Sequence, residues 1–168
     1  MKKKFKVLKI IAAAVAFVCV AIIAANVVCM NIMFKKIEAF EDSGTKILQF
    51  ENYDNGCYNI TTDGEFKVLQ ITDVHIGGGF MSVKKDTNAL NAVAAMITYE
   101  KPDFVIVTGD IAFPVPYAAG TFNNKTGAKE LAALMEELGV YWTLNFGNHD
   151  TEIYSYFAGS AGRHRQCG

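Results

Sequence analysis

The sequence predicts an α/β fold that follows one transmembrane helix. Three features of the chain support this prediction. A long uncharged apolar run lies near the amino terminus, three shorter apolar runs are each followed by a polar cluster, and the segments between those shorter runs have helical periodicity. Strands that alternate with helices usually form one sheet with right-handed crossovers. We therefore expect a β-α-β-α-β unit with parallel strands behind a membrane anchor.

Residues 1–36 form the predicted anchor. Residues 10–34 carry no charge, and as a helix they would be about 37 Å long, which exceeds the roughly 30 Å of a hydrocarbon core. More lysines precede this run than follow it: Lys2, Lys3, Lys4, Lys6 and Lys9 against Lys35 and Lys36. This asymmetry predicts a single-pass protein with a cytoplasmic amino terminus, a domain outside the cytoplasm, and lipid around residues 10–34.

A cleaved signal peptide is the alternative for this segment. The amino end is basic, and small residues such as Ala24 and Ala25 lie within the run. The apolar core of a signal peptide usually has only about 7–15 residues, which is shorter than this run. The uncleaved anchor is therefore our expectation, with secretion after cleavage as the lesser alternative.

The composition of the whole chain argues against two kinds of ligand. The sequence has 168 residues and a formal net charge of -1, so it lacks the basic balance typical of proteins that bind nucleic acid. No CxxC pair occurs among the four cysteines, so a cysteine zinc site is not expected. Composition leaves the oligomeric state open.

Residues 37–65 are predicted to be a spacer and an edge hairpin. Thr45–Phe50 and Cys57–Thr61 have strand character, and Asn55-Gly56 between them is a strong hairpin-turn signal. We expect this hairpin to lead into the parallel sheet and to carry no chemistry.

The strands and helices of the sheet domain follow from Phe66 onward. Strands are predicted at Phe66–Thr72, Phe104–Thr108 and Val140–Phe146, with helices at Lys84–Glu100 and Thr126–Leu138. Apolar stripes define the inner faces of the two helices: Leu90, Val93, Ala94, Met96 and Ile97 in the first, and Leu131, Leu134, Met135 and Leu138 in the second. Pro102 and Gly139 are expected to end these helices.

A polar cluster follows each predicted strand. These clusters are Asp73-Val74-His75, Gly109-Asp110 and Gly147-Asn148-His149-Asp150. In parallel sheets, ligands bind beyond the carboxyl ends of the strands, so these side chains should meet at one edge. Carboxylate, imidazole and amide groups suit hard or borderline divalent metals. The sequence therefore predicts a metal-dependent hydrolase.

Each residue type suits a particular place in a two-metal site. On an extended backbone Asp73 and His75 would point the same way and would bind one ion. Asp110 has two carboxylate oxygens and would bridge two ions, and Asn148 offers a neutral oxygen to the second. His149 is expected to be catalytic beside the phosphate, with Asp150 setting its tautomer.

In these motifs the chain resembles the calcineurin-like metallophosphoesterases, in the branch that includes purple acid phosphatases and cyclic-nucleotide phosphodiesterases. The resemblance covers Phe66–Asp150 and implies the N-terminal half of a metallophosphoesterase α/β sandwich, at residues 66–157. It implies two divalent ions (manganese, iron or zinc) bound by Asp73, His75, Asp110 and Asn148. It also implies hydrolysis of phosphate mono- or diesters by a metal-activated hydroxide, with His149 acting at the phosphate.

The end of the chain departs from this pattern. The family's later histidine and its Gly-His-x-His element have no counterpart, and residues 158–168 are predicted to be an irregular tail produced by truncation. We expect weak metal binding and poor turnover from this chain. The alternative is a non-catalytic, membrane-anchored α/β remnant or binding module. A Rossmann-like nucleotide binder is disfavoured because Gly77-Gly78-Gly79 lacks the GxGxxG spacing.

Overall fold

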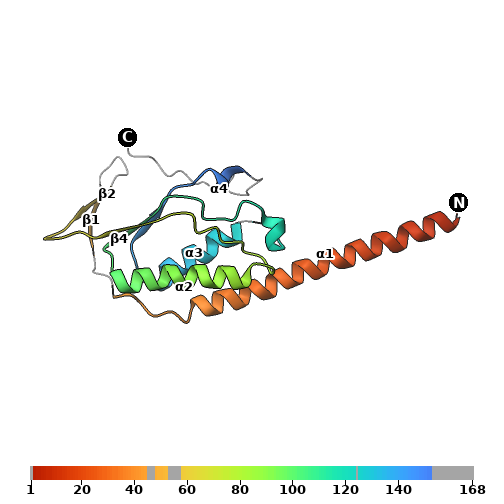
Figure 1. Cartoon of the computed structure of the whole chain (residues 1–168), viewed down its shortest axis with the longest axis horizontal. Helices are drawn as coiled ribbons and strands as arrows, with labels where there is room; N and C mark the ends of the chain where they lie inside the picture. The colour runs from red at the N-terminus through yellow and green to blue at the C-terminus, as the bar shows by residue number, and fades with distance from the viewer. Residues whose placement is uncertain (1, 45–47, 53–57, 124, 153–168) are drawn as a thin grey trace.

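A computed structural model describes residues 2–44, 48–52, 58–123 and 125–152. The elements in chain order are α1 (Lys2–Ile37), β1 (Gln49–Asn52), β2 (Tyr58–Thr61), β3 (Val68–Ile71), α2 (Val83–Glu100), β4 (Phe104–Val107), the 3₁₀ helix η1 (Pro116–Ala119), α3 (Lys125–Glu137), β5 (Trp142–Leu144) and α4 (His149–Glu152). Figure 1 shows α1 as a long helix that extends well beyond the rest of the chain.

The sheet that positions the site has the order β3-β4-β5, with both pairs parallel. Val68 pairs with Phe104, and Val105 pairs with Trp142. The predicted α/β fold with parallel strands is therefore confirmed. Each strand is shorter than the sequence predicted, since β3 and β5 begin two residues later and all three strands end before the polar clusters.

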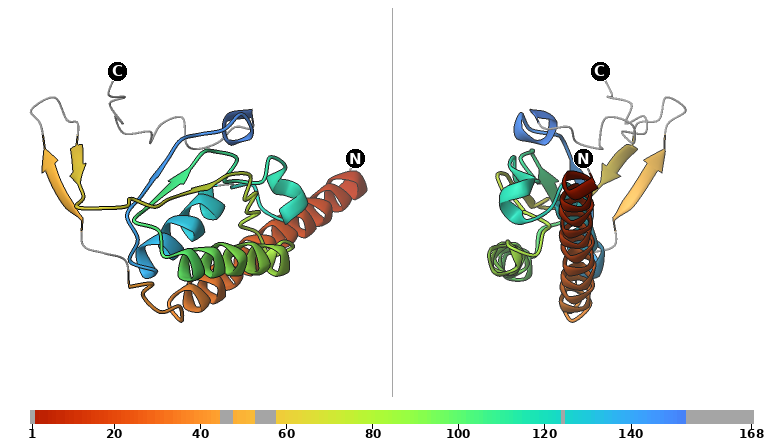
Figure 2. Two further views of the ribbon diagram at one scale, coloured as in Figure 1. Left: turned by 60° about the vertical axis from the view of Figure 1, so that its left-hand side comes forward. Right: turned by 90° about the vertical axis from the view of Figure 1, so that its right-hand side faces the viewer.

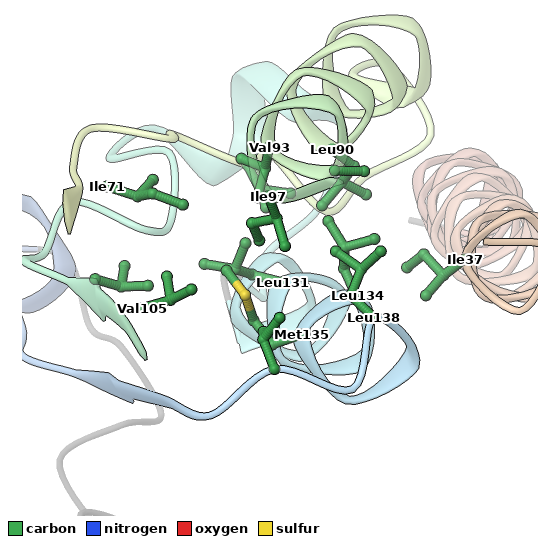
Figure 3. Packing of buried hydrophobic residues seen from close by; sticks show 14 of the residues in the cluster. Ile37, Ile71, Leu90, Val93, Ile97, Val105, Leu131, Leu134, Met135 and Leu138 are labelled. Carbon is green, nitrogen blue, oxygen red and sulfur yellow. The ribbon is translucent and has the colours of Figure 1, made fainter. Parts of the chain in front are cut away.

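Three layers build the core. In Figure 3, Ile71 and Val105 of the sheet lie on one side and Ile37 of α1 on the other, with residues of α2 and α3 between them. The predicted stripes on α2 and α3 face this core, apart from Met96, which is 42% exposed. Met96 lies one position before the buried Ile97, so the helix turns it away from the core.

The carboxyl-terminal end of α1 belongs to this core. Met33 and Ile37 are each only 2% exposed, and both lie in the same apolar cluster as the sheet. After the helix, Ser43 donates hydrogen bonds from its backbone N–H and its hydroxyl to the carbonyl of Leu138, at 3.0 and 2.8 Å. Figure 2 shows the orange, carboxyl-terminal end of α1 beside α2. This end of the helix is therefore part of the domain, and the expectation that lipid surrounds residues 10–34 is wrong at the end of the run, because the domain covers Met33.

The predicted hairpin is present, but its place differs. β1 and β2 pair antiparallel, and Asn52 pairs with Tyr58, so the first strand runs to Asn52 and past the predicted end at Phe50. Thr45–Ile47 and the turn at residues 53–57 lie outside the described residues. Within the part that the structure describes, the hairpin precedes the parallel sheet in the chain and forms a separate two-stranded sheet.

Candidate metal centre

The three polar clusters follow β3, β4 and β5 at one edge of the sheet, as the parallel topology requires. The loop after β3 is also tied to the loop after β4 by three backbone hydrogen bonds. Asp73 N–H donates to Gly109 O at 3.2 Å, His75 N–H to Asp110 O at 3.0 Å, and Ile76 N–H to Ile111 O at 2.8 Å. These bonds hold the two ligand-bearing loops side by side.

The backbone of the site is not extended. Asp73, His75 and Asp110 have φ values of 57°, 50° and 51°, in the left-handed region. The expectation that Asp73 and His75 share one side of an extended strand is therefore wrong, because β3 ends at Ile71. A left-handed residue costs about 1–2 kcal/mol, and such strain gathers at functional sites. Here the cross-loop hydrogen bonds maintain the strained conformation that aims the side chains.

Asp73, His75 and Asp110 bring one ligand atom each within 4.8 Å of one another. Oδ1 of Asp73 lies 3.6 Å from Nε2 of His75, too far for a hydrogen bond. Two ligands that each lie about 2.0–2.2 Å from one ion are separated by roughly 3–3.6 Å, so this spacing fits a shared cation. The hard carboxylates and the imidazole also fit manganese, iron or zinc. The site's donor set therefore suits a divalent metal.

Asp110 connects this group to the loop after β5. Its side chain is mostly buried, at 8% exposure, and Oδ1 accepts a hydrogen bond from the backbone N–H of His149 at 3.0 Å. The ring of His149 lies 5.7 Å from the ring of His75, centroid to centroid. The structure thus brings His149 to the same edge as the three grouped ligands.

Asn148 lies in this loop and is exposed. The glycine before it explains how the loop comes so close to Asp110. A Cβ on Gly147 would collide with the Asp110 carboxylate, and a Cβ on Gly109, whose φ is 105°, would collide with the backbone of Gly147. Both glycines are therefore required for the approach of the second and third clusters.

Asp150 has a set of partners that adjacency alone did not predict. Its carboxylate is 1% exposed, and Oδ1 accepts hydrogen bonds from Ile111 and Ala112 N–H, both at 3.0 Å. Oδ2 accepts a third from Gly147 N–H at 2.9 Å. A buried carboxylate bound by three amides fastens the loop after β5 to the loop after β4. Asp150 therefore has the geometry of a residue that positions the site.

A second acidic cluster supports the loop behind His75. Asp86 on α2 accepts hydrogen bonds from Gly77 N–H (2.9 Å), Gly78 N–H (3.0 Å) and the Ser82 hydroxyl (2.6 Å). Glu130 on α3 is 1% exposed, and burial, with the charge of Asp86, raises its pKa to about 8. Sequence reasoning missed this cluster. The available signal was an acid in the first turn of α2, shortly after three glycines whose backbone N–H groups need acceptors.

Comparison with known proteins agrees with the geometry. The sequence profile described as calcineurin-like phosphoesterase matches residues 66–167. The chain belongs to this family. It is similar to "Probable inactive purple acid phosphatase 28" of Arabidopsis thaliana, with 31% identity over 54% of this chain and 24% of that protein. It is also similar to "Probable inactive purple acid phosphatase 14" of the same plant, with 26% identity over 81% of this chain and 33% of that protein.

A yeast phosphatase is also similar to this chain. "Phosphatase DCR2" of Saccharomyces cerevisiae is 26% identical over 55% of this chain and 17% of its own length. No solved structure gives a significant match. The chain thus spans a third or less of the length of these curated relatives.

Proposed function

We propose that this calcineurin-like phosphoesterase hydrolyses phosphate mono- or diesters at a centre of two divalent ions. The observation that carries the proposal is the convergence of Asp73, His75 and Asp110 within 4.8 Å at the carboxyl edge of a parallel sheet. Metal ions at such a site polarise phosphoryl oxygens and lower the pKa of water.

Each residue has a distinct proposed role. Asp73 and His75 hold the first ion, Asp110 bridges, and Asn148 holds the second. The buried Nδ1 of His75 has no hydrogen-bond partner among the described residues, which leaves Nε2, on the Asp73 side, as the ligand atom.

His149 is the proposed catalytic residue. Its backbone N–H donates to Oδ1 of Asp110 at 3.0 Å, which holds His149 next to the proposed bridging ligand. There the imidazole donates a hydrogen bond to a phosphate oxygen or to the leaving oxygen, where negative charge develops. Asp150, held by three backbone amides, keeps this loop in place and acts as a positioning residue.

The tether is part of the proposal. Within the described residues one helix, Lys4–Ile37, is long and apolar enough to cross a membrane, by length and composition, although a signal sequence near the amino terminus passes the same criterion. The length of the apolar run favours an uncleaved anchor, and the lysine asymmetry favours a domain outside the cytoplasm. The mass of the mature amino-terminal peptide tests this, because cleavage would remove the helix.

A non-catalytic binding module is the second candidate. Two of the relatives are named as probable inactive purple acid phosphatases, and the chain covers only a part of each. A metal site that binds ions without turnover would fit this alternative.

Metal titration and turnover of the same sample separate these functions. The full chain in detergent is titrated with Mn²⁺ and Zn²⁺ by calorimetry, then assayed with para-nitrophenyl phosphate and its bis-ester. Asp110→Asn should abolish or greatly weaken ion binding, and Asp63→Asn, an exposed acid away from the site, should not. Binding with turnover supports the enzyme, and binding without turnover supports the module. Equal ion binding by both variants would disprove the bridging role of Asp110.

A further inference from the structure

The point where α1 leaves the domain is marked by a polar side chain inside the apolar run. Asn26 Nδ2 donates to Gly120 O at 2.8 Å, and Asn26 Oδ1 accepts from Phe80 N–H at 3.0 Å. Gly120 ends η1 in the loop after β4, and Phe80 lies in the loop after β3. Figures 1 and 2 show the η1 segment beside α1 where the helix leaves the domain. Both loops are therefore fixed to the helix at Asn26.

The length of the run places this contact at the membrane boundary. A hydrocarbon core about 30 Å thick takes up about 20 helical residues. Counted from the end of the lysine cluster at Lys9, it would reach to about Cys29. Asn26 lies about one helical turn inside that limit. Lysine side chains that reach back to the interface would shift the boundary of the core by a similar distance. The two loops therefore lie at the level of the lipid headgroups.

The side chains around this contact suit that position. Phe80 is 37% exposed, Met81 65%, Tyr117 68% and Phe122 77%, on the same two loops that contact Asn26. Tyr and Trp are enriched at the interface between membrane and water, and Phe is typical of the apolar faces that dip into it. A groove next to Phe80 and Met81 is also lined by Lys36 and Lys84. Apolar side chains with cations behind them suit an interface that contains anionic lipid.

These loops follow the carboxyl ends of β3 and β4, the edge that carries Asp73, His75 and Asp110. The metal-ligand edge therefore lies at the end of the domain where Asn26 of α1 contacts these loops. Met81, Ala118 and Ala119 also line a small cavity with His75. The exposed apolar loops and the wall of the candidate site are thus continuous.

We propose that Phe80, Met81, Tyr117 and Phe122 form a membrane-seating surface that holds the domain on the bilayer with its metal-ligand edge facing the lipid. This inference rests on the proposed anchor and extends it, because it adds a direct contact between these loops and the lipid headgroups. The occupant of the surface is the headgroup layer of the same membrane that α1 crosses.

Fluorescence quenching by lipid tests this surface in the full chain. Trp142 is the only tryptophan, so a Trp142→Phe background allows one reporter at a time. The reporters are Phe122→Trp and Tyr117→Trp on the seating surface, Tyr99→Trp as an 86% exposed control at the far end of α2, and Phe17→Trp in the anchor. Each variant, its fold verified by circular dichroism, is reconstituted in two kinds of vesicle of phosphatidylcholine and phosphatidylglycerol. The phosphatidylcholine is brominated close to its headgroup in one kind and near the ends of its acyl chains in the other.

We expect the two surface reporters to lose fluorescence with the headgroup-brominated lipid, Phe17→Trp to lose it with the acyl-brominated lipid, and Tyr99→Trp to lose none with either. Quenching at Phe17→Trp without quenching at either surface reporter would refute the seating surface and leave the anchor intact. No quenching at any position would refute the anchor and the seating surface together. Quenching at Tyr99→Trp equal to that at the surface would also refute the proposed orientation.

Discussion

Glu130 provides the sharpest test of how burial controls this protein's stability. It lies on α3 with 1% exposure, and its Oε2 has no hydrogen-bond partner among the described residues. Asp86 across the interface is 2% exposed and is committed to the glycine loop behind His75. Burial, and then the charge of Asp86, raise the pKa of Glu130 from 4.5 to about 8. Glu130 is therefore protonated in the folded protein at neutral pH.

The sign of the pH effect follows from that direction. In the unfolded chain Glu130 ionises at its ordinary pKa, near 4.5, but in the folded protein only near 8. The folded state is therefore favoured fully below pH 4.5, and the advantage is lost as the pH rises to about 8. At about 1.4 kcal/mol per pKa unit the loss is at most about 5 kcal/mol, and water that enters around the ionised group would reduce it.

Glu130→Gln removes the ionisation with little change of shape. Urea unfolding of the detergent-solubilised full chain, followed by Trp142 fluorescence between pH 5 and pH 9, measures the effect. We expect the variant to gain stability relative to the wild type with rising pH, by several kcal/mol at the alkaline end. Glu137→Gln, on the same helix and without the buried neighbour, should follow the wild type. If Glu130→Gln also follows the wild type at every pH, the buried acid does not control the stability.

Three further predictions concern contacts seen only in the folded protein. Asp150→Ala leaves three backbone N–H groups without their acceptor, at about 1–3 kcal/mol each. Urea unfolding should therefore show an unfolding free energy lower by about 3 kcal/mol or more. A loss no larger than that of Asp63→Ala would contradict the anchoring role. Gly147→Ala places a methyl group against the Asp110 carboxylate, so calorimetry should show Mn²⁺ binding weakened at least about tenfold. Gly64→Ala, at a position with open space around it, should leave the Mn²⁺ affinity unchanged. Asn26→Leu removes both hydrogen bonds between α1 and the loops and should lower the unfolding free energy by about 1–3 kcal/mol. Val27→Leu, at an exposed position of the same helix, is the control. An equal loss in the control would show that the hydrogen bonds are not responsible.

Much of the fold was predictable because it depends on local patterns. The periodicity of α2 and α3, the proline after α2 and the glycine after α3 located both helices to within about a residue. The short apolar runs identified the three parallel strands, although each was predicted too long. Hydrophobic pattern alone does not show where hydrogen-bonded pairing ends, and here it ends where the ligand loops turn away.

The candidate site was predictable as a set of residues but not as a geometry. Motif order and strand ends sufficed to name Asp73, His75 and Asp110 as a group and His149 as a neighbour of His75, whereas the role of Asn148 stays a prediction. The left-handed backbone of Asp73, His75 and Asp110 depends on hydrogen bonds between loops that are distant in the sequence. The three amide partners of Asp150 likewise come from two different loops.

The sequence by itself determined the alternation of strands and helices, the family motifs and the long apolar helix, because each depends on residue types at short, regular spacings. Only the tertiary structure decided that the end of α1 is part of the core, that Asn26 fastens two loops to it, and that Glu130 is buried beside Asp86. These features depend on which distant surfaces meet, and that is set by the packing of the whole chain.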